Sequence, residues 1–506
     1  MRRTAWLSCL PLAFLLVVQV VPALHVIAQG FATGGGPTDW WAPWTDAYLR
    51  KRMLWSFAQA SLSCLLVLAL GLPVGWVLAR FEFSGRAAVL RLLMLPFVVP
   101  TLVAAMGVLA LLGSAGQGTP WLLLFGNVFF NLCVVVRSVV DALEQVSASR
   151  VAAARTLGAG PWRAFWRVEW PAIAPWVMSA LCLVFLYCFS GFGLALVLGG
   201  QDYATVEVEI YTLVAHELQL QQAAVLALWV LVITGFFAYL YARIERTLAT
   251  PAKADRIVRR APANWRQWLA LAGALTVLAC VCAAPLSAIL WQAVMAGPQA
   301  WLVLLQDETR DALWNTLRFS VLSVMLATVL GVLHALVARK LLWMRTLVYL
   351  PFVVSPVLGA FGLLLAYPYW AGSFWVLVAG YALLAAPFVA KSVAARLDSL
   401  PENYLHAART LGASPWRCFV RVTLPLLRGA LQRGVAFAAA TAVGEFAVTL
   451  FLARPEWATL TTLIYQHLGR PGAANRDAAL VLACALMGLT LLAFLLIESK
   501  AGEEDA

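Results

Sequence analysis

The chain has 506 residues, of which 63% are hydrophobic and only 12% are charged. Because this charged fraction is about half that of an average soluble domain, the composition excludes an ordinary water-soluble fold and a disordered or nucleic-acid-binding chain. Lys and Arg outnumber Asp and Glu by 36 to 24, but basic residues in a membrane protein mostly record topology. The nine cysteines show no paired or metal-ligand spacing, so neither a disulfide framework nor a metal site is indicated.

Long apolar runs predict membrane-spanning helices, because a helix needs about 20 apolar residues to cross a bilayer. Twelve such runs lie at residues 5–28, 53–79, 87–113, 119–140, 172–199, 222–243, 267–295, 313–338, 342–368, 373–393, 427–453 and 477–498. They are continuous, whereas the strands of a membrane barrel alternate in hydrophobicity. The sequence therefore predicts an all-α integral membrane protein with about 12 transmembrane helices.

The basic residues predict the orientation of these helices. With a cytoplasmic N-terminus, 28 of the 36 Lys and Arg residues fall in inner segments, as the positive-inside rule requires. We expect both termini in the cytoplasm and interpret residues 50–52 as a basic collar on the outer side. The basic start of the chain also permits a cleaved signal peptide, although the length of the first apolar run favours an uncleaved span.

An internal repeat divides the chain. The residues Ala154–Ala159 recur as Ala408–Ala413, an offset of 254, and the same offset relates Ile210–Tyr211 to Ile464–Tyr465. Each copy contains six predicted spans, so the copies insert as parallel six-helix repeats. The predicted organisation is a first repeat, a basic cytoplasmic linker, a second repeat and an acidic tail, at residues 1–243, 244–266, 267–499 and 500–506.

The repeated segment lies between the fourth and fifth span of each half and carries the candidate contact residues. Gly412 is expected to end one short helix, and Ser414 and Pro415 to begin a second, with aromatic and arginine side chains on neighbouring faces. The candidates are Ala153, Ala154, Gly158, Trp162, Arg163, Phe165 and Arg167 in the first copy, and Ala407, Ala408, Gly412, Trp416, Arg417, Phe419 and Arg421 in the second. Such residues also serve as interfacial anchors, but their paired arrangement favours a binding surface for a partner.

These residues resemble the cytoplasmic-loop motif of the permeases of binding-protein-dependent ABC importers. That motif runs Glu-Ala-Ala, three residues, Gly, nine residues, an aliphatic residue, one residue, Leu-Pro. The second copy matches it at Ala407–Ala408, Gly412, Val422 and Leu424–Pro425, and the first at Ala153–Ala154, Gly158, Val168 and Pro171. Both copies depart from the motif at its acidic position, which is occupied by Ala152 and His406.

The resemblance covers nearly the whole chain and implies a type I ABC importer permease of the fused thiamine or iron(III) type. It implies a bacterial inner-membrane protein whose loops dock on cytoplasmic ATPase subunits, expected as a homodimer, and which receives its solute from a periplasmic binding protein. We expect thiamine rather than iron(III), on stretches such as Val168–Pro171 and Leu198–Gly200. The chain has no phosphate-binding loop. ATP and Mg therefore belong to the partner, and the chain itself is predicted to be neither an enzyme nor a cofactor-binding protein.

Glu445 is the clearest ionisable residue inside a predicted span, and such residues suggest a functional site. The resemblance implies that it faces the translocation path, whereas a structural carboxylate fits the sequence equally well. Ser190 and Asn131 are weaker path candidates, and for Asn131 and His334 a packing role is favoured. In the outer loop of the first half, four acidic residues either meet a binding protein or are solvated: Asp202, Glu207, Glu209 and Glu217.

An ion-coupled secondary transporter is the alternative class, since it too can have twelve spans in two parallel halves. Such transporters usually carry several charged residues deep in their spans, whereas Glu445 is nearly alone. In the favoured interpretation, the binding protein contacts the outer loops at residues 29–52, 200–221 and 454–476.

Overall fold

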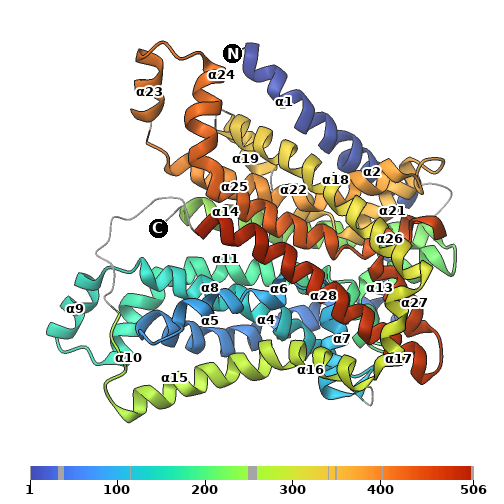
Figure 1. The fold of residues 1–506 in the computed structure, drawn as a ribbon, viewed down its shortest axis with the longest axis horizontal. Coiled ribbons are helices and arrows are strands. Elements are labelled where there is room, and N and C mark those ends of the chain that lie inside the picture. Colours follow the sequence, from blue (N-terminus) through green and yellow to red (C-terminus); the bar gives the residue numbers. More distant parts are fainter. Residues whose placement is uncertain are drawn as a thin grey trace. The chain divides into compact units, whose positions relative to one another are not determined.

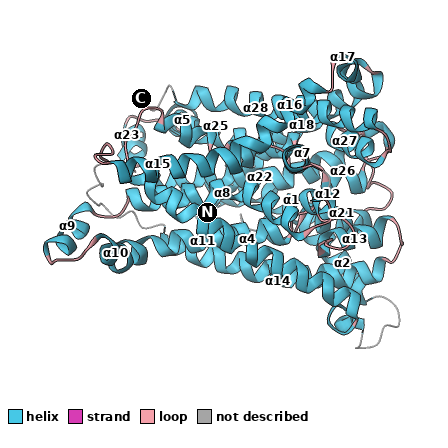
Figure 2. Ribbon diagram, turned by 90° about the horizontal axis from the view of Figure 1, so that it is seen from below, coloured by secondary structure: helices cyan, strands magenta, loops and turns pink. Residues whose placement is uncertain are grey.

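The computed structural model describes residues 2–31, 39–113, 116–248, 259–339, 341–347, 350–401 and 403–502. In these residues the regular structure is helical apart from one isolated β-bridge between Phe81 and Arg260 (Figures 1 and 2). Part of the predicted linker, residues 249–258, and most of the predicted acidic tail, residues 503–506, lie outside the described residues.

Eleven of the twelve predicted spans have counterparts that are long and apolar enough to cross a membrane. Ten are helices of the described chain, and a bent pair supplies the eleventh. The ten helices are Cys9–Phe31, Ala47–Arg80, Pro120–Glu144, Pro161–Phe189, Leu220–Glu245, Trp265–Met295, Asp307–Ala338, Phe374–Ser399, Pro415–Leu452 and Ala473–Ile497. The predicted all-helical membrane fold is confirmed, and the described chain has ten or eleven candidate spans where the sequence predicts about twelve.

The third and ninth predicted spans are broken rather than continuous. In the first half, α5 (Arg86–Leu92) and α6 (Leu95–Val98) meet α7 (Thr101–Leu112) at a bend of 104°. In the second half, α19 (Leu342–Leu347), α20 (Leu350–Val353) and α21 (Pro356–Ala366) lie at the equivalent place. Pro100 and Pro356 follow the same pentapeptide, Leu-Pro-Phe-Val-Val, with one serine inserted in the second copy. A proline disfavours helical backbone at the residue before it, which explains why each helix stops there.

The remaining helices repeat in the same order in both halves. In the first half they are α4 (Ala47–Arg80), α8 (Pro120–Glu144), α9 (Ala148–Thr156), α10 (Pro161–Ala164), η4 (Phe165–Glu169), α11 (Trp170–Phe189), α12 (Gly193–Leu198), α13 (Val206–Ala215) and α14 (Leu220–Leu248). In the second half they are α18 (Asp307–Ala338), α22 (Phe374–Ser399), α23 (Asn403–Thr410), α24 (Pro415–Cys418), η7 (Phe419–Thr423), α25 (Leu424–Val443), α26 (Ala447–Leu452), α27 (Leu460–Gly469) and α28 (Ala473–Gly502).

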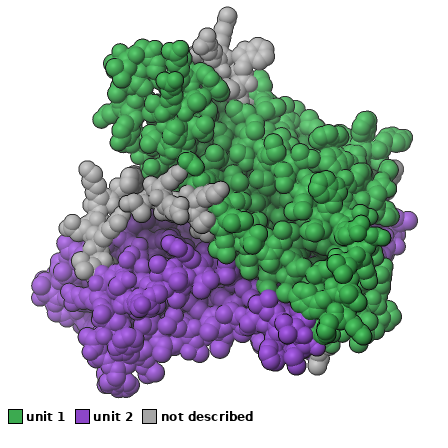
Figure 3. Space-filling model, in the orientation of Figure 1, with its two compact units in different colours: residues 1–32, 98–100, 296–506 green, residues 33–97, 101–295 purple. Residues whose placement is uncertain are grey.

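The helices group into two compact units that do not coincide with the two repeats (Figure 3). One unit contains residues 1–32, 98–100 and 296–506, and the other contains residues 33–97 and 101–295. The first helix of each repeat therefore packs with the other repeat. The predicted domain boundaries follow the sequence repeats and stay a prediction. Helix packing groups the first helix of each repeat differently.

Specific contacts hold these exchanged helices in place. Within the first unit, α1 (Arg2–Leu15) packs on α18 and α2 (Val21–Phe31) packs on α21, and Gln19 Nε2 donates a hydrogen bond of 2.6 Å to Leu350 O. Within the second unit, α15 (Trp265–Leu278) packs on α4 and α16 (Ala284–Met295) packs on α7. A side chain added at Gly107 would lie 2.9 Å from Pro285 O, so the approach of α16 requires glycine there.

Four π-helical segments in the described chain share one sequence feature. They are η1 (Leu16–Val20), η4, η5 (Ala279–Ala283) and η7, and each is followed at its second residue by a proline: Pro22, Pro171, Pro285 or Pro425. Proline cannot donate a backbone hydrogen bond, and its ring clashes with the carbonyl four residues earlier. The wider π-turn accommodates the ring without ending the helix.

Candidate functional site

The two predicted contact loops, residues 147–169 and 401–423, have the same turn. Gly158 and Gly412 adopt left-handed backbone angles, with φ of +82° and +75°. The amide of each glycine donates a hydrogen bond of 3.0 Å to the carbonyl three residues earlier, and the amide of the following alanine donates to the carbonyl five residues earlier. This pair of hydrogen bonds defines the Schellman motif, in which glycine is favoured because it has no Cβ. The predicted glycine stops are confirmed.

The start of the second helix in each loop is also confirmed, but its extent is not. Ser414 Oγ accepts the amide of Arg417 at 3.4 Å, and Pro415 is in the first turn. The sequence predicts a separate short helix here. Instead, α10 and α24 continue through η4 and η7 into the fifth span of each half. The π-turns before Pro171 and Pro425 keep the helix unbroken, so each loop is mechanically continuous with a membrane span.

Both loops expose large apolar side chains to nearly the same degree. Trp162 and Trp416 are 72% and 71% exposed, and Leu157 and Leu411 are 87% and 88% exposed. Exposed tryptophan and leucine at matching positions of two repeats are typical of a surface that a partner covers. The first loop has the larger aromatic cluster, since the rings of Trp162 and Trp166 are 5.7 Å apart, whereas the position of Trp166 is Val420 in the second copy.

The other predicted loop residues divide into exposed charges and half-buried packing positions. The exposed residues are Arg163 and Arg167 in the first loop and Arg417 and Arg421 in the second, together with Ala153 and Ala407; Ala154, Ala408, Phe165 and Phe419 are half-buried. Ala152 and His406, at the position where the motif has a carboxylate, are both exposed. The described loop surfaces are therefore apolar and basic.

Glu445 lies at the break between α25 and α26, where the predicted eleventh span bends. Its side chain is buried, and its Oε1 accepts the amide of Val448 at 3.0 Å. Thr461 Oγ1 donates to the Glu445 carbonyl at 2.9 Å. The carboxylate thus satisfies a backbone donor that a helix start leaves without an intrahelical partner. This contact supports the structural role, while the path role stays a prediction.

Asn131 lies in a buried polar network of the first half, together with Gln59, Asn127 and Ser63. Asn127 Nδ2 donates to Gln59 Oε1 at 2.7 Å and to Ser63 Oγ at 3.0 Å. Asn131 Nδ2 donates to Asn127 O at 2.9 Å, and its Oδ1 is buried without a hydrogen bond in the described structure. The network joins α4 to α8 within one unit. It supports a helix-packing role for Asn131.

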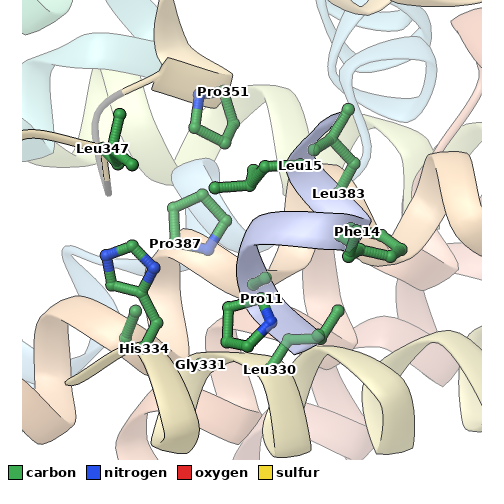
Figure 4. Close-up of a pocket in the computed structure, with 12 residues that line it drawn as sticks. Pro11, Phe14, Leu15, Leu330, Gly331, His334, Leu347, Pro351, Leu383 and Pro387 are labelled. Atoms are coloured by element: carbon green, nitrogen blue, oxygen red, sulfur yellow. The ribbon is translucent and has the colours of Figure 1, made fainter. Parts of the chain in front are cut away.

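Ser190 and His334 make local backbone contacts. Ser190 Oγ donates to Leu186 O at 2.5 Å, where α11 ends before α12. His334 Nε2 lies 2.9 Å from Met344 O. Its ring lines a mostly apolar pocket, and Figure 4 shows Pro11, Phe14 and Pro387 on the other walls. Each side chain has a partner that explains its position by packing.

The first two turns of α4 carry an ion pair that the sequence interpretation missed. Arg52 Nε lies 3.3 Å from Glu209 Oε2, and the Tyr48 hydroxyl donates to the same oxygen at 2.9 Å. Burial raises the pKa of Glu209 above its ordinary value, although the Tyr48 hydrogen bond and the Arg52 charge lower it. The interpretation of residues 50–52 as an interfacial collar therefore fails for Arg52, which is 7% exposed and paired with Glu209.

The four acidic residues between α12 and α14 also differ in burial. Asp202 and Glu217 are exposed, as expected, but Glu207 and Glu209 are buried. The prediction of a solvated or partner-binding acidic cluster fails for these two, because both are buried. Glu209 contacts Arg52 and Tyr48 of α4. A stripe at helical spacing, residues 48, 52, 56, 59 and 63 of α4, is polar throughout and was the available signal for this inward-facing polar side.

Known proteins resemble the chain over nearly its full length. It is 29% identical to the "Thiamine transport system permease protein ThiP" of Escherichia coli strain K12, over 92% of the chain and 91% of that protein. It is 27% identical to the protein of the same name from Haemophilus influenzae, over 90% of each. A "Sulfate transport system permease protein CysW" of Synechocystis is 30% identical, over 38% of the chain and 74% of that protein.

The repeats also match one protein family twice, at residues 71–249 and 323–499, and the family is described as "Binding-protein-dependent transport system inner membrane component". These matches include both loops and confirm the resemblance seen in the sequence. They exclude the secondary-transporter alternative, and they place the chain among proteins that are not catalytic and bind no cofactor themselves. The chain belongs to the family of multi-pass inner-membrane permeases of binding-protein-dependent ABC importers.

Proposed function

We propose that the chain forms the translocation path of a thiamine importer. The observation that carries this proposal is the full-length similarity to relatives named thiamine permeases, which extends over at least 90% of both chains for three such relatives. The sulfate permease, in contrast, covers only 38% of the chain. Similarity across both halves and their outer segments supports thiamine over iron(III).

The two loops dock on the ATPase subunits. Trp162 and Trp416 are the central contacts, and the flanking arginines bind the rim of the partner. The equal exposure of the two tryptophans, 72% and 71%, supports two equivalent partner sites and hence an ATPase homodimer. Because each loop is continuous with a membrane span, closure of the ATPase dimer displaces α11 and α25 directly. ATP and Mg are bound by those subunits alone.

The proposed topology places both termini and both loops in the cytoplasm. The periplasmic binding protein then delivers its solute to the opposite face, at the outer loops around residues 29–52, 200–221 and 454–476. Glu445, Ser190 and Asn131 are proposed to border the path. The helix breaks at Ser190 and after Val443 support this assignment for the first two, because irregular backbone at membrane depth normally lines a cavity.

Uptake of labelled thiamine, measured in parallel with uptake of iron(III), tests the substrate. Cells that lack the chain are compared with cells that express it and with cells that express the variant Gly158→Arg/Gly412→Arg at equal membrane levels. We expect thiamine uptake to return only with the unaltered chain. Restoration of iron(III) uptake alone would overturn the thiamine assignment but not the ABC permease family.

A further inference from the structure

A buried carboxylate joins the end of the first loop to the last turn of α4. Glu169 is 1% exposed and is the last residue of η4. It forms an ion pair with Arg80, the last residue of α4, and Trp76 Nε1 donates to its other oxygen at 3.4 Å. The Arg80 guanidinium lies 4.7 Å from the centre of the Trp76 ring. Two side chains near the end of α4, Trp76 and Arg80, thus hold one carboxylate of the loop.

A second buried carboxylate holds the opposite end of the same helix. Glu209 is 3% exposed and lies in α13. It contacts Arg52 and Tyr48 in the first two turns of α4, and Arg52 also donates to Asp202 O at 3.0 Å. Glu169 and Glu209 lie on either side of α11 and α12 in the chain. Helix α4 is therefore fixed at both ends to the segment that leads from the first loop through the membrane.

The second half has neither carboxylate. The offset of 254 places Thr423 at the position of Glu169 and Leu463 at the position of Glu209. Thr423 Oγ1 donates to Cys418 O at 3.5 Å, within its own turn, and Leu463 is fully buried. Helices α4 and α18 do share one hydrogen bond, between a hydroxyl of the helix and the amide of the first residue of α13 or α27. Ser56 Oγ accepts the amide of Val206 at 2.7 Å, and Thr316 Oγ1 accepts that of Leu460 at 3.0 Å.

These contacts fix the position of the first loop on α4 more than they add to the stability of the fold. A buried ion pair recovers little beyond the cost of removing both charges from water, and apolar pairs of similar volume are often as stable. Its hydrogen-bonding groups, however, accept only a narrow range of distances and directions. A loop held this way cannot slide along α4 without leaving a charge buried and unpaired.

We infer that Glu169 is a positioning residue that passes displacement of the first loop to α4, with Glu209 securing the far end, and that the second half, as far as the structure describes it, lacks this rigid connection. The inference rests on the proposed docking of the loops on an ATPase. It predicts that the two loops are unequal: displacement of the first moves α4 and α11 together, whereas displacement of the second moves α25 with less effect on α18.

Neutral substitutions in the assembled complex test the inference. The main variant is Arg80→Gln/Glu169→Gln, which leaves no unpaired charge, and Thr423→Val at the equivalent position of the second half is the matched control. The complex of this chain with its ATPase and binding protein is reconstituted in lipid. Two quantities are measured: amide hydrogen exchange of residues 161–169 and 415–423, and solute transported per ATP hydrolysed.

We expect the double variant to remain bound to its ATPase subunits. Amide hydrogen exchange of residues 161–169 should become at least about tenfold faster, as loss of a charge-assisted hydrogen bond implies. Solute transported per ATP should fall by a similar factor, and exchange of residues 415–423 should not change. Thr423→Val should alter neither quantity. Trp76→Phe, which removes the indole donor but keeps an aromatic ring, should shift both in the same direction by less.

Unchanged exchange and unchanged transport per ATP in every variant that inserts would overturn the inference. A purely structural role would instead lower thermal stability and leave transport per ATP at its normal value, which also counts against it. Failure of the proposed function gives a different result, because the unaltered chain would then show neither ATPase binding nor ATP-driven uptake. Trp76→Phe retains both charges and an aromatic ring, so it decides the matter if the double variant does not insert.

Discussion

The turn at Gly158 and Gly412 allows a quantitative test of loop geometry. Both residues have left-handed backbone angles, and a Cβ added at either position would meet nothing within 4 Å. Replacement by alanine therefore introduces no clash. It costs only the backbone penalty of an L-residue in this region, about 1–2 kcal/mol per site. Asparagine tolerates the same conformation with a smaller penalty, so it is the matched control.

The penalty acts on the loop and not on the bundle. At each site it lowers the population of the native turn relative to other turns by a factor of about 5 to 30. The sites lie in separate loops, so their costs should add to about 2–4 kcal/mol in the double variant. We expect Gly158→Ala/Gly412→Ala to insert normally but to lose most ATP-driven transport, and Gly158→Asn/Gly412→Asn to keep most of it.

The assay reconstitutes each variant with the ATPase and the binding protein, and it measures ATP hydrolysis and thiamine uptake at matched permease levels. We expect clearly lower transport for the alanine double variant than for the asparagine double variant. Equal activity of the two double variants, whether both high or both low, would refute the claim that the left-handed turn controls docking.

Three further outcomes follow from single contacts. Replacement of Trp162 or Trp416 by alanine should weaken ATPase binding by about 2–4 kcal/mol, as expected for a central tryptophan of an interface, and co-purification at rising salt should show it. Burial raises the pKa of Glu209, so the folded chain binds this proton more tightly than the unfolded chain. The contribution of Glu209 to stability should thus increase as pH falls through its folded pKa towards 4.5, and the melting temperature of Glu209→Gln should lack this part of the pH dependence. Glu445→Gln keeps the oxygen that accepts the Val448 amide, so it should fold normally but transport poorly; full uptake would leave only the structural role.

Much of the fold was predictable because lipid imposes simple rules. Apolar runs of sufficient length gave eleven of the spans, and the offset of 254 identified the repeat. The breaks before Pro100 and Pro356 were missed because the runs remain apolar across them, although the repeated Leu-Pro-Phe-Val-Val stretch was a usable signal. The hydropathy averaged over a span does not change when one proline, which has no backbone N–H to donate, interrupts the helix.

The candidate site was predictable where local backbone chemistry determines it. Gly412, Ser414 and Pro415 each adopt the expected turn or cap, because these preferences depend on neighbouring residues alone. The ion pairs of Arg52 with Glu209 and of Arg80 with Glu169 join residues far apart in sequence. No short-range pattern reveals such partners, and the charged ends of spans were interpreted as solvated or interfacial. The exchange of first helices between the units is likewise a matter of tertiary packing.

ATP-dependent accumulation of thiamine in sealed proteoliposomes tests the central claim most directly. The vesicles contain this chain and its ATPase, with the binding protein outside and ATP enclosed with the loops. If an ATPase drives import through the two loops, accumulation requires the enclosed ATP, persists when proton and sodium gradients are collapsed, and is abolished by Gly158→Arg/Gly412→Arg. Accumulation driven by an ion gradient without ATP, or normal accumulation by the double variant, would contradict it.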